Sequence, residues 1–283
     1  MGWQEWPLFV FTVIAQSAIG AFWWCCAALL AGNLSADQYS HLNGLMLVVW
    51  AMAAFAFSAS AFHLGTPLRA INASFRFGRS PLSNEAVFGG AFVGLGVVGW
   101  IMSTWDIGSD TSQLFVLGLT VVCSIAFLAS MIWFYMMPTV PTWNTPLTPA
   151  AYVLTTIIGG SAVAAALFAA AGIVRPDFLR LGPVTLVSAA LVVAVAVALR
   201  QNALLPGINS SIKRATDLSP HYASLMAIRF VILFSALGLW WLDMLRLGTL
   251  TVSAAITCVV LILVAEMIGR GVHFGLHMTV GLR

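Results

Sequence analysis

The chain has 283 residues, of which 61% are hydrophobic and only 7% are charged. Soluble domains average about 25% charged residues, so a soluble fold is excluded and we expect an integral membrane protein. The formal net charge of +3 is too small and too dispersed to indicate a nucleic-acid-binding protein.

Long apolar runs divide the sequence. A spanning helix needs roughly 20 mostly apolar residues. Such runs lie near residues 7–31, 41–62, 85–104, 113–136, 149–172, 182–203, 222–243 and 249–270. They lack the ten-residue alternation of a membrane barrel. We therefore predict an all-α, polytopic bundle of about eight transmembrane helices, forming one domain over residues 1–283. The start of the sequence has no basic region and its apolar run is too long for a signal peptide, so the first span should be retained.

The positions of tryptophan and glycine agree with these predicted spans. Trp residues at 3, 6, 50, 100, 105, 143, 240 and 241 fall near predicted span ends, as interfacial aromatics do. The third span is rich in glycine, at positions 89, 90, 94, 96 and 99. Small residues let helix backbones approach closely, so this span is expected to pack tightly.

Eight spans place both termini at one end of the bundle, together with the connections 63–84, 137–148 and 204–221. We call this end face A and the opposite end face B. Basic residues at positions 69, 76, 79, 200, 213, 214, 270 and 283 favour face A, against 175, 180 and 246 at face B. The positive-inside rule therefore puts face A in the cytoplasm. Three of these charges belong to a candidate site, which weakens that inference.

The candidate site is the stretch 62–85, FHLGTPLRAINASFRFGRSPLSNE. His63 ends the second predicted span and Glu85 begins the third. Pro81, with Ser83 or Asn84 as N-cap, is expected to start that helix. Glu85 would then lie in its first turn, where the helix dipole favours an anion.

Two interpretations of His63 and Glu85 remain open. In the first, both are structural: His63 is a histidine at a span end bonded to a carbonyl, and Glu85 is an acid at a helix start. Alternatively, they flank one pocket in which the histidine bonds a quinone oxygen and the carboxylate passes the proton to water. Ionisable residues in a membrane are functional candidates by default.

Other polar residues support structural interpretations. Glu266 and Arg270, at i and i+4 near the end of the last span, suggest an ion pair, with Arg229 as an alternative partner of Glu266. His273 and His277 are expected to have non-ligand roles. The four cysteines lie in apolar runs without metal-ligand spacing, so they are interpreted as core residues.

Four segments together resemble a known family. They are WQEWPLFVFTV near the start, FHLGTPLRA with LSNE, TVPTW, and GRGVHFGLHMTVG near the end. In order and span count the whole sequence resembles the membrane-anchor subunit of dimethyl sulfoxide reductase, the DmsC family, related to the NrfD-like quinol-interacting anchors.

The resemblance implies a function in bacterial anaerobic respiration at the cytoplasmic membrane. Anchors of the family oxidise menaquinol and pass electrons to a four-cluster iron–sulfur subunit, and then to a molybdopterin catalytic subunit. The family's quinol-site residues correspond to His63 and Glu85. Arg69, Arg76 and Asn84 of the same stretch are our further candidates for quinol binding or loop support. The resemblance implies no haem, metal or iron–sulfur cluster in this protein.

The family also implies that face A looks outward, because its catalytic partner is exported, which is opposite to the charge count. The family implies a dimethyl sulfoxide reductase-type complex, and the terminal acceptor stays open between dimethyl sulfoxide, an N-oxide, selenate and another oxyanion, because that pocket lies in a different subunit. A proton-coupled transporter is a rival from another class, although such proteins place charges and broken helices at the bilayer midplane. Here the charges gather at one face.

Overall fold

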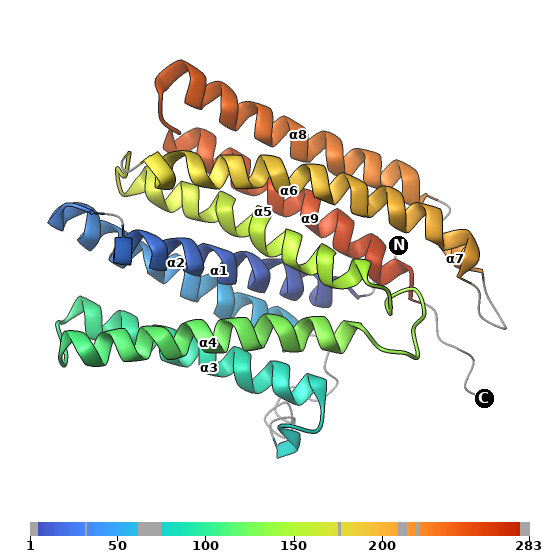
Figure 1. The fold of residues 1–283 in the computed structure, drawn as a ribbon, viewed down its shortest axis with the longest axis horizontal. Coiled ribbons are helices and arrows are strands. Elements are labelled where there is room, and N and C mark those ends of the chain that lie inside the picture. Colours follow the sequence, from blue (N-terminus) through green and yellow to red (C-terminus); the bar gives the residue numbers. More distant parts are fainter. Residues whose placement is uncertain are drawn as a thin grey trace.

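The computed structural model is a bundle of eight long helices that run roughly parallel to one another (Figure 1). It describes residues 5–31, 33–61, 75–174, 177–208, 214–218 and 221–277. The long helices are α1 (Trp6–Ala31), α2 (Ala36–Ala61), α3 (Pro81–Thr104), α4 (Asp110–Tyr135), α5 (Leu147–Ala170), α6 (Asp177–Leu204), α8 (Tyr222–Leu247) and α9 (Val252–Gly275). A 3₁₀ turn (Leu205–Gly207) and the short helix α7 (Ala215–Leu218) follow α6. The described part contains no strand, which confirms the all-α prediction.

All eight long helices are long and apolar enough to cross a membrane, as predicted. Several begin a few residues earlier than the apolar runs, because their first turns are polar. α4 starts at Asp110, where Ser109 and Ser112 form a reciprocal capping box. α6 starts at Asp177 and includes Pro183, which has no N–H to donate to the carbonyl of Leu179 one turn earlier.

α1 and α5 form the centre of the bundle. They pack against each other, α1 also contacts α2, and α5 also contacts α6 and α9. The pair α3 and α4 lies on one side of this centre and α8 lies on the other (Figure 1). Face A, on the right of Figure 1, holds the start of α1 and the end of α9.

Among the described glycines, those that meet the backbone of another helix lie in α1 and α5, and none of them lies in α3. A Cβ added to Gly160 would collide with the Cα of Gly20, so neither helix can carry a side chain there. In α3, Gly89 and Gly96 instead make room for aromatic rings, Phe57 and Trp50 respectively. The glycine-rich span therefore accommodates side chains, and the tight backbone crossing lies elsewhere.

Two of the tryptophans expected at span ends are core residues. Trp50 lies midway along α2, buried against Phe22 and Phe92 with ring centroids 5.4 Å apart in each pair. Trp240 is also fully buried. Trp105, by contrast, is exposed at the face B end of α3, as expected for an interfacial aromatic.

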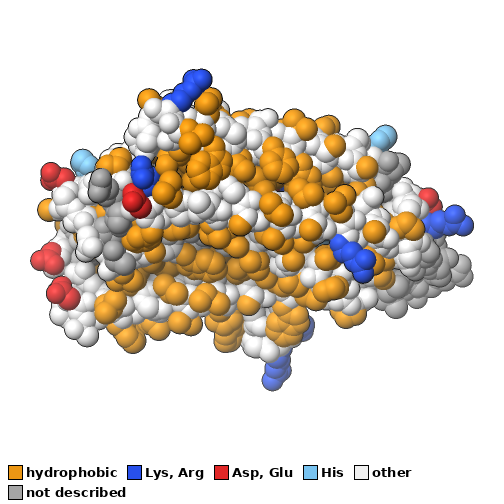
Figure 2. All heavy atoms as spheres, turned by 45° about the horizontal axis from the view of Figure 1, so that its top comes forward, with side chains coloured by type: hydrophobic (Ala, Val, Ile, Leu, Met, Phe, Trp, Pro, Cys, Tyr) orange, Lys and Arg blue, Asp and Glu red, His pale blue; other side chains and the backbone are white. Residues whose placement is uncertain are grey.

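The outer surface matches a lipid environment. Hydrophobic side chains cover most of the middle of the face shown in Figure 2, and acidic side chains gather at its left end, which is face B. Exposed apolar side chains in mid-helix include Val122, Val192 and Val231. Such a surface needs an apolar solvent.

Candidate functional site

Glu85 lies where the polypeptide re-enters the bundle at face A. α3 begins one residue after Ser80, with Pro81 at its first position, where the fixed φ of proline suits a helix start. Ser80, not Ser83 or Asn84, is therefore the N-cap, and the prediction of the cap was wrong. Asn84 belongs to the first turn, and its Oδ1 accepts a hydrogen bond from the Gly78 amide at 2.7 Å. Asn84 thus fixes the turn that precedes the helix.

Glu85 is buried, with 5% of its surface exposed. Its Oε2 has no hydrogen-bond partner, and within the described ranges no basic group forms an ion pair with it. Gly89, one turn further along α3, faces Phe127 of α4, so Glu85 lies beside the face A end of that helix. A buried carboxyl oxygen without a partner is costly, which makes Glu85 a functional candidate rather than a solvated acid at a helix start.

Among the described residues, the arginines of the predicted site form no ion pair with Glu85. Arg76 is exposed, as is Arg79, and neither pairs with an acid among the described residues. His63 and Arg69 lie in 62–74, outside the described residues. The proximity of His63 to Glu85 therefore stays a prediction.

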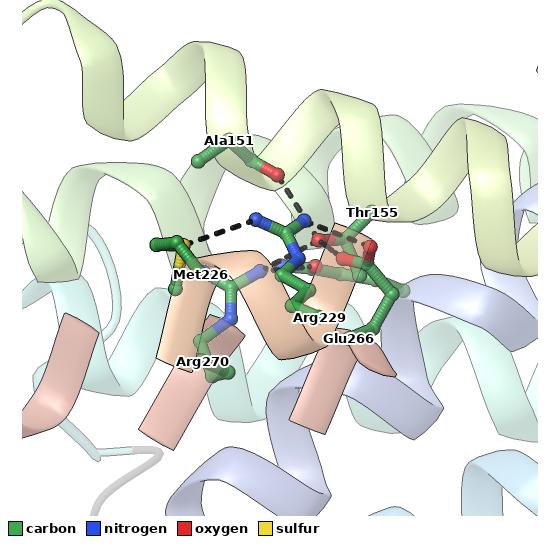
Figure 3. Close-up of polar contacts among 7 residues, drawn as sticks. Ala151, Thr155, Met226, Arg229, Glu266 and Arg270 are labelled. Carbon is green, nitrogen blue, oxygen red and sulfur yellow. Dashed lines mark hydrogen bonds and ion pairs between the residues drawn. The ribbon is translucent and has the colours of Figure 1, made fainter. Parts of the chain in front are cut away.

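A second polar cluster lies deeper in the bundle (Figure 3). Arg229 Nη2 of α8 donates to Glu266 Oε1 of α9 at 2.8 Å. Glu266 Oε2 accepts from Thr155 Oγ1 of α5 at 2.6 Å. Arg270 Nη2 donates to Thr155 Oγ1 at 3.2 Å and to Gln16 Oε1 of α1 at 2.8 Å. These bonds join four helices.

The ion pair of Glu266 is thus with Arg229, and the pair with Arg270 suggested by the i,i+4 spacing does not form. Arg270 turns toward α1 and α5, and its guanidinium carbon lies 3.6 Å from the centroid of the Tyr152 ring, a cation–π contact. Gly269 lets Arg229 lie across α9, because a Cβ at 269 would come within 2.7 Å of Arg229 Nε.

An aromatic group covers this cluster on the face A side. Tyr135 and Tyr152 have ring centroids 5.5 Å apart, and Trp143 stacks on His273 at 5.5 Å. The connection 136–146 carries Trp143 and closes over the end of α9: Thr142 donates to the Leu276 carbonyl at 2.5 Å, and Trp143 Nε1 to the His273 carbonyl at 2.8 Å. These bonds satisfy carbonyls that the helix end leaves free. The TVPTW segment is therefore a structural cap.

The sequence interpretation missed Gln16, Tyr135, Tyr152 and Thr155. A signal was present, because Gln16 and Thr155 stand inside otherwise apolar runs, and polar residues in spans often bond between helices. Their partners depend on how the helices rotate, which a single sequence does not give.

The cavities do not coincide with Glu85. The larger, about 330 Å³, lies toward face B between α1, α2, α3 and α4, lined by Tyr39, Asn43, Trp50 and Trp100 among others. A groove of about 70 Å³ beside Arg229 and His273 is lined by residues of α5, α6, α8 and α9. The largest pocket is the default ligand site. Here the buried carboxyl of Glu85 is the stronger indicator, because an acceptor without a partner is costly to bury unless a ligand supplies its hydrogen bond.

Metal-ligating residues do not gather in the described part of the protein. The cysteines at 25, 26, 123 and 258 are free, and three of them are buried. No group of three or more His, Cys, Asp or Glu is arranged there to hold a metal ion.

The sequence model of the DMSO reductase anchor subunit (DmsC) family matches residues 1–276. The protein belongs to this family. It is 39% identical to the C subunit of the anaerobic dimethyl sulfoxide reductase of Escherichia coli K12, over 99% of this sequence and 98% of that protein. It is 37% identical to the anaerobic dimethyl sulfoxide reductase subunit YnfH of the same organism, with the same coverage. Identity to the corresponding C subunit of Haemophilus influenzae is 33%, again over 99% and 98%.

As a DmsC-family protein, the molecule is the anchor subunit of a dimethyl sulfoxide reductase complex, an oxidoreductase. The family agrees with the fold, since eight apolar helices make a multi-pass membrane protein. Both polar features of this anchor, Glu85 and the cluster around Glu266, belong to the half of the bundle nearer face A.

Proposed function

We propose that this anchor binds menaquinol beside Glu85 and oxidises it, passing the electrons to an iron–sulfur subunit docked on face A. From there they reach a molybdopterin subunit that reduces dimethyl sulfoxide, in the cytoplasmic membrane of a bacterium. Three observations support the proposal: the family match, the names of the relatives, which are subunits of dimethyl sulfoxide reductases, and the state of Glu85.

The observation that carries the proposal is the buried Oε2 of Glu85, which has no partner in the described structure. A quinol O–H is a donor of the kind this acceptor lacks. Lipid-soluble quinol has access to such a position because Glu85 lies just inside the face A end of a spanning helix. A buried acceptor that waits for a donor is a binding group, and a carboxylate is also a base.

The reaction releases two protons and two electrons from each quinol. Glu85 takes a proton from one quinol hydroxyl, and His63 is proposed to bond the other oxygen and take the second. The electrons leave singly to an iron–sulfur centre of the partner subunit, and menaquinone is released to the membrane. Glu85 and His63 then return their protons to water at face A.

The test is Glu85→Gln in the assembled complex in membranes. Gln keeps the size and hydrogen bonding but cannot accept the proton, so quinol oxidation should fall about 10²–10⁴-fold, while a fluorescent quinol analogue binds within a few fold of wild type. Asp217→Asn is the matched control, an exposed acid at the same end, and should leave turnover unchanged. Wild-type turnover in Glu85→Gln would contradict the proposal.

His63 is tested separately. His63→Arg places a bulky fixed charge that cannot cycle a proton, so quinol-dependent turnover should be abolished while the subunits stay assembled. The amount of complex is measured by immunoblot and its catalytic subunit by an artificial electron donor. If the variant oxidises quinol at the wild-type rate, His63 has no part in the site.

A further inference from the structure

The deeper cluster holds two guanidinium groups and one carboxylate. Arg229 pairs directly with Glu266, whereas Arg270 reaches Glu266 only through Thr155 and otherwise donates to the neutral Gln16. Arg270 is 4% exposed and Glu266 1% exposed. The cluster therefore carries one positive charge without a counter-charge in its hydrogen bonds. An uncompensated charge inside a membrane protein is expensive and marks a functional site.

The position of that charge is fixed from several sides. Two hydrogen bonds to α1 and α5 and the cation–π contact with Tyr152 hold the Arg270 guanidinium. Gln16 is held in turn, because its amide donates to Met131 Sδ of α4 at 3.1 Å. A charge fixed in this way stabilises a nearby anion without a reorganisation cost.

The charge lies on the Glu85 side of the cluster. The Arg270 guanidinium lies over the ring of Tyr152, and this ring packs against Tyr135. Gln16, which accepts from Arg270, bonds in turn to Met131 of α4, and the α3–α4 contact at Gly89 and Phe127, one turn away, brings Glu85 to the level of Met131. The Tyr152 hydroxyl, like Glu85 Oε2, has no hydrogen-bond partner of acceptable geometry in the described structure.

Resting on the proposed quinol oxidation, we propose that Arg270 electrostatically stabilises the anionic form of the quinol at the Glu85 site. With Glu85 ionised, Glu85 and Glu266 balance Arg229 and Arg270. When Glu85 takes a quinol proton, an O–H bond breaks on the quinol and one forms on the carboxyl, and the negative charge moves to the quinol oxygen. The quinolate keeps the charge balance with Arg270. When one electron then passes to the partner's iron–sulfur centre and the second hydroxyl proton leaves to water at face A, the semiquinone anion keeps it as well.

With its proton on Glu85, the site should therefore prefer anionic quinone-like rings, and binding of such a ring should be accompanied by proton uptake at Glu85. The probes are a 2-hydroxy-3-alkyl-1,4-naphthoquinone, whose ring hydroxyl is ionised at neutral pH, and its neutral 2-methoxy ether. The ionised probe should inhibit quinol oxidation by the wild-type complex at about tenfold lower concentration or better, given the strength of charge interactions at low dielectric. Equal inhibition, or stronger inhibition by the ether, would overturn the inference.

Variants of Arg270 separate charge from packing. Arg270→Gln should lower kcat about tenfold or more and bring the two inhibition constants together, whereas Arg270→Lys should keep the preference because it keeps the charge. Arg200→Gln, at an exposed arginine of the same end, is the control. A fall in kcat with the probe preference intact would show that Arg270 is only structural. If Arg270→Gln does not assemble, the wild-type comparison of the two probes decides.

Failure of this inference differs from failure of the proposed function. If Glu85→Gln abolishes turnover while Arg270→Gln retains both turnover and probe preference, only the role of Arg270 is wrong. If Glu85→Gln keeps full turnover, the quinol site itself is misplaced.

Discussion

Gly269 of α9 and Arg229 of α8 fit together only because the glycine has no side chain: a Cβ would lie 2.7 Å from Nε and 2.8 Å from Cζ of the arginine. The guanidinium crosses α9 at this point and reaches Glu266 beyond it at 2.8 Å. One glycine therefore determines whether the buried ion pair can form.

Gly269→Ala should push the guanidinium away from Glu266. We expect a loss of about 1–3 kcal/mol, the range for overpacking, measured as a lower thermal midpoint of the detergent-solubilised complex. Gly238→Ala, also on a spanning helix and with open space around it, should be neutral or slightly stabilising because alanine favours helix. Equal midpoints for the two variants would show that Arg229 adapts freely.

Gly160→Ala should be more harmful than Gly269→Ala. The added Cβ would meet the backbone of Gly20, and backbone cannot rotate away as an arginine can. We expect α1 and α5 to separate, with a loss above about 3 kcal/mol, beyond the usual overpacking range. The amount of assembled complex in membranes and its midpoint measure this, with Gly118→Ala, which has open space, as control. Normal assembly of Gly160→Ala would contradict the close contact.

Glu266→Gln should destabilise the anchor strongly. It leaves two buried guanidinium groups without a carboxylate, and breaking a buried pair from one side costs about 3–5 kcal/mol. The double variant Arg229→Gln, Glu266→Gln removes a charge of each sign, so it should be more stable than the single variant. Thermal midpoints of both give the comparison, and a less stable double variant would show that Glu266 does not offset Arg229.

Arg76 and Arg79 should take part in docking if the partner surface is acidic. Both are exposed at face A. Neutralising the two with glutamine should weaken subunit association at low salt and have little effect at high salt, because exposed pairs are screened within about 8–10 Å. Arg246→Gln, exposed at face B, is the control. Association that is unchanged at low salt would leave these arginines as solvated residues.

The spans were predictable because bilayer thickness dictates long apolar runs, and all eight were confirmed. What depends on helix rotation was not predictable. In the sequence, Trp50 and Trp100 both stand near the end of a predicted span. In the structure Trp50 is buried against Gly96, whereas Trp100 is only partly buried and donates to the Asn43 carbonyl at 2.9 Å. Likewise the i,i+4 spacing suggested an ion pair between Glu266 and Arg270, but in the structure Glu266 pairs with Arg229 of the neighbouring helix.

The candidate site was predictable only in part. Scarcity of charge pointed to Glu85, whose burial the structure supports. The position of Ser80 as N-cap was missed because three polar residues near Pro81 compete for that position, and only the backbone conformation distinguishes them. The Thr155 and Gln16 partners of Arg270 come from helices far apart in sequence, so no local spacing rule finds them.

The charged cluster also has a consequence for how the protein is made. Ribosomal synthesis delivers α8 before α9, and a lone arginine in an inserting helix costs up to about 2.5–3.5 kcal/mol, the value for the helix centre. Arg229 meets its carboxylate only when Glu266 arrives on the next helix, and the connection 248–251 is short. The two helices should therefore enter the membrane as one hairpin, with α1 and α5 already in place to receive Arg270. A polypeptide that stops before α9 would expose an unpaired charge to lipid, which distinguishes an unfinished anchor from a complete one.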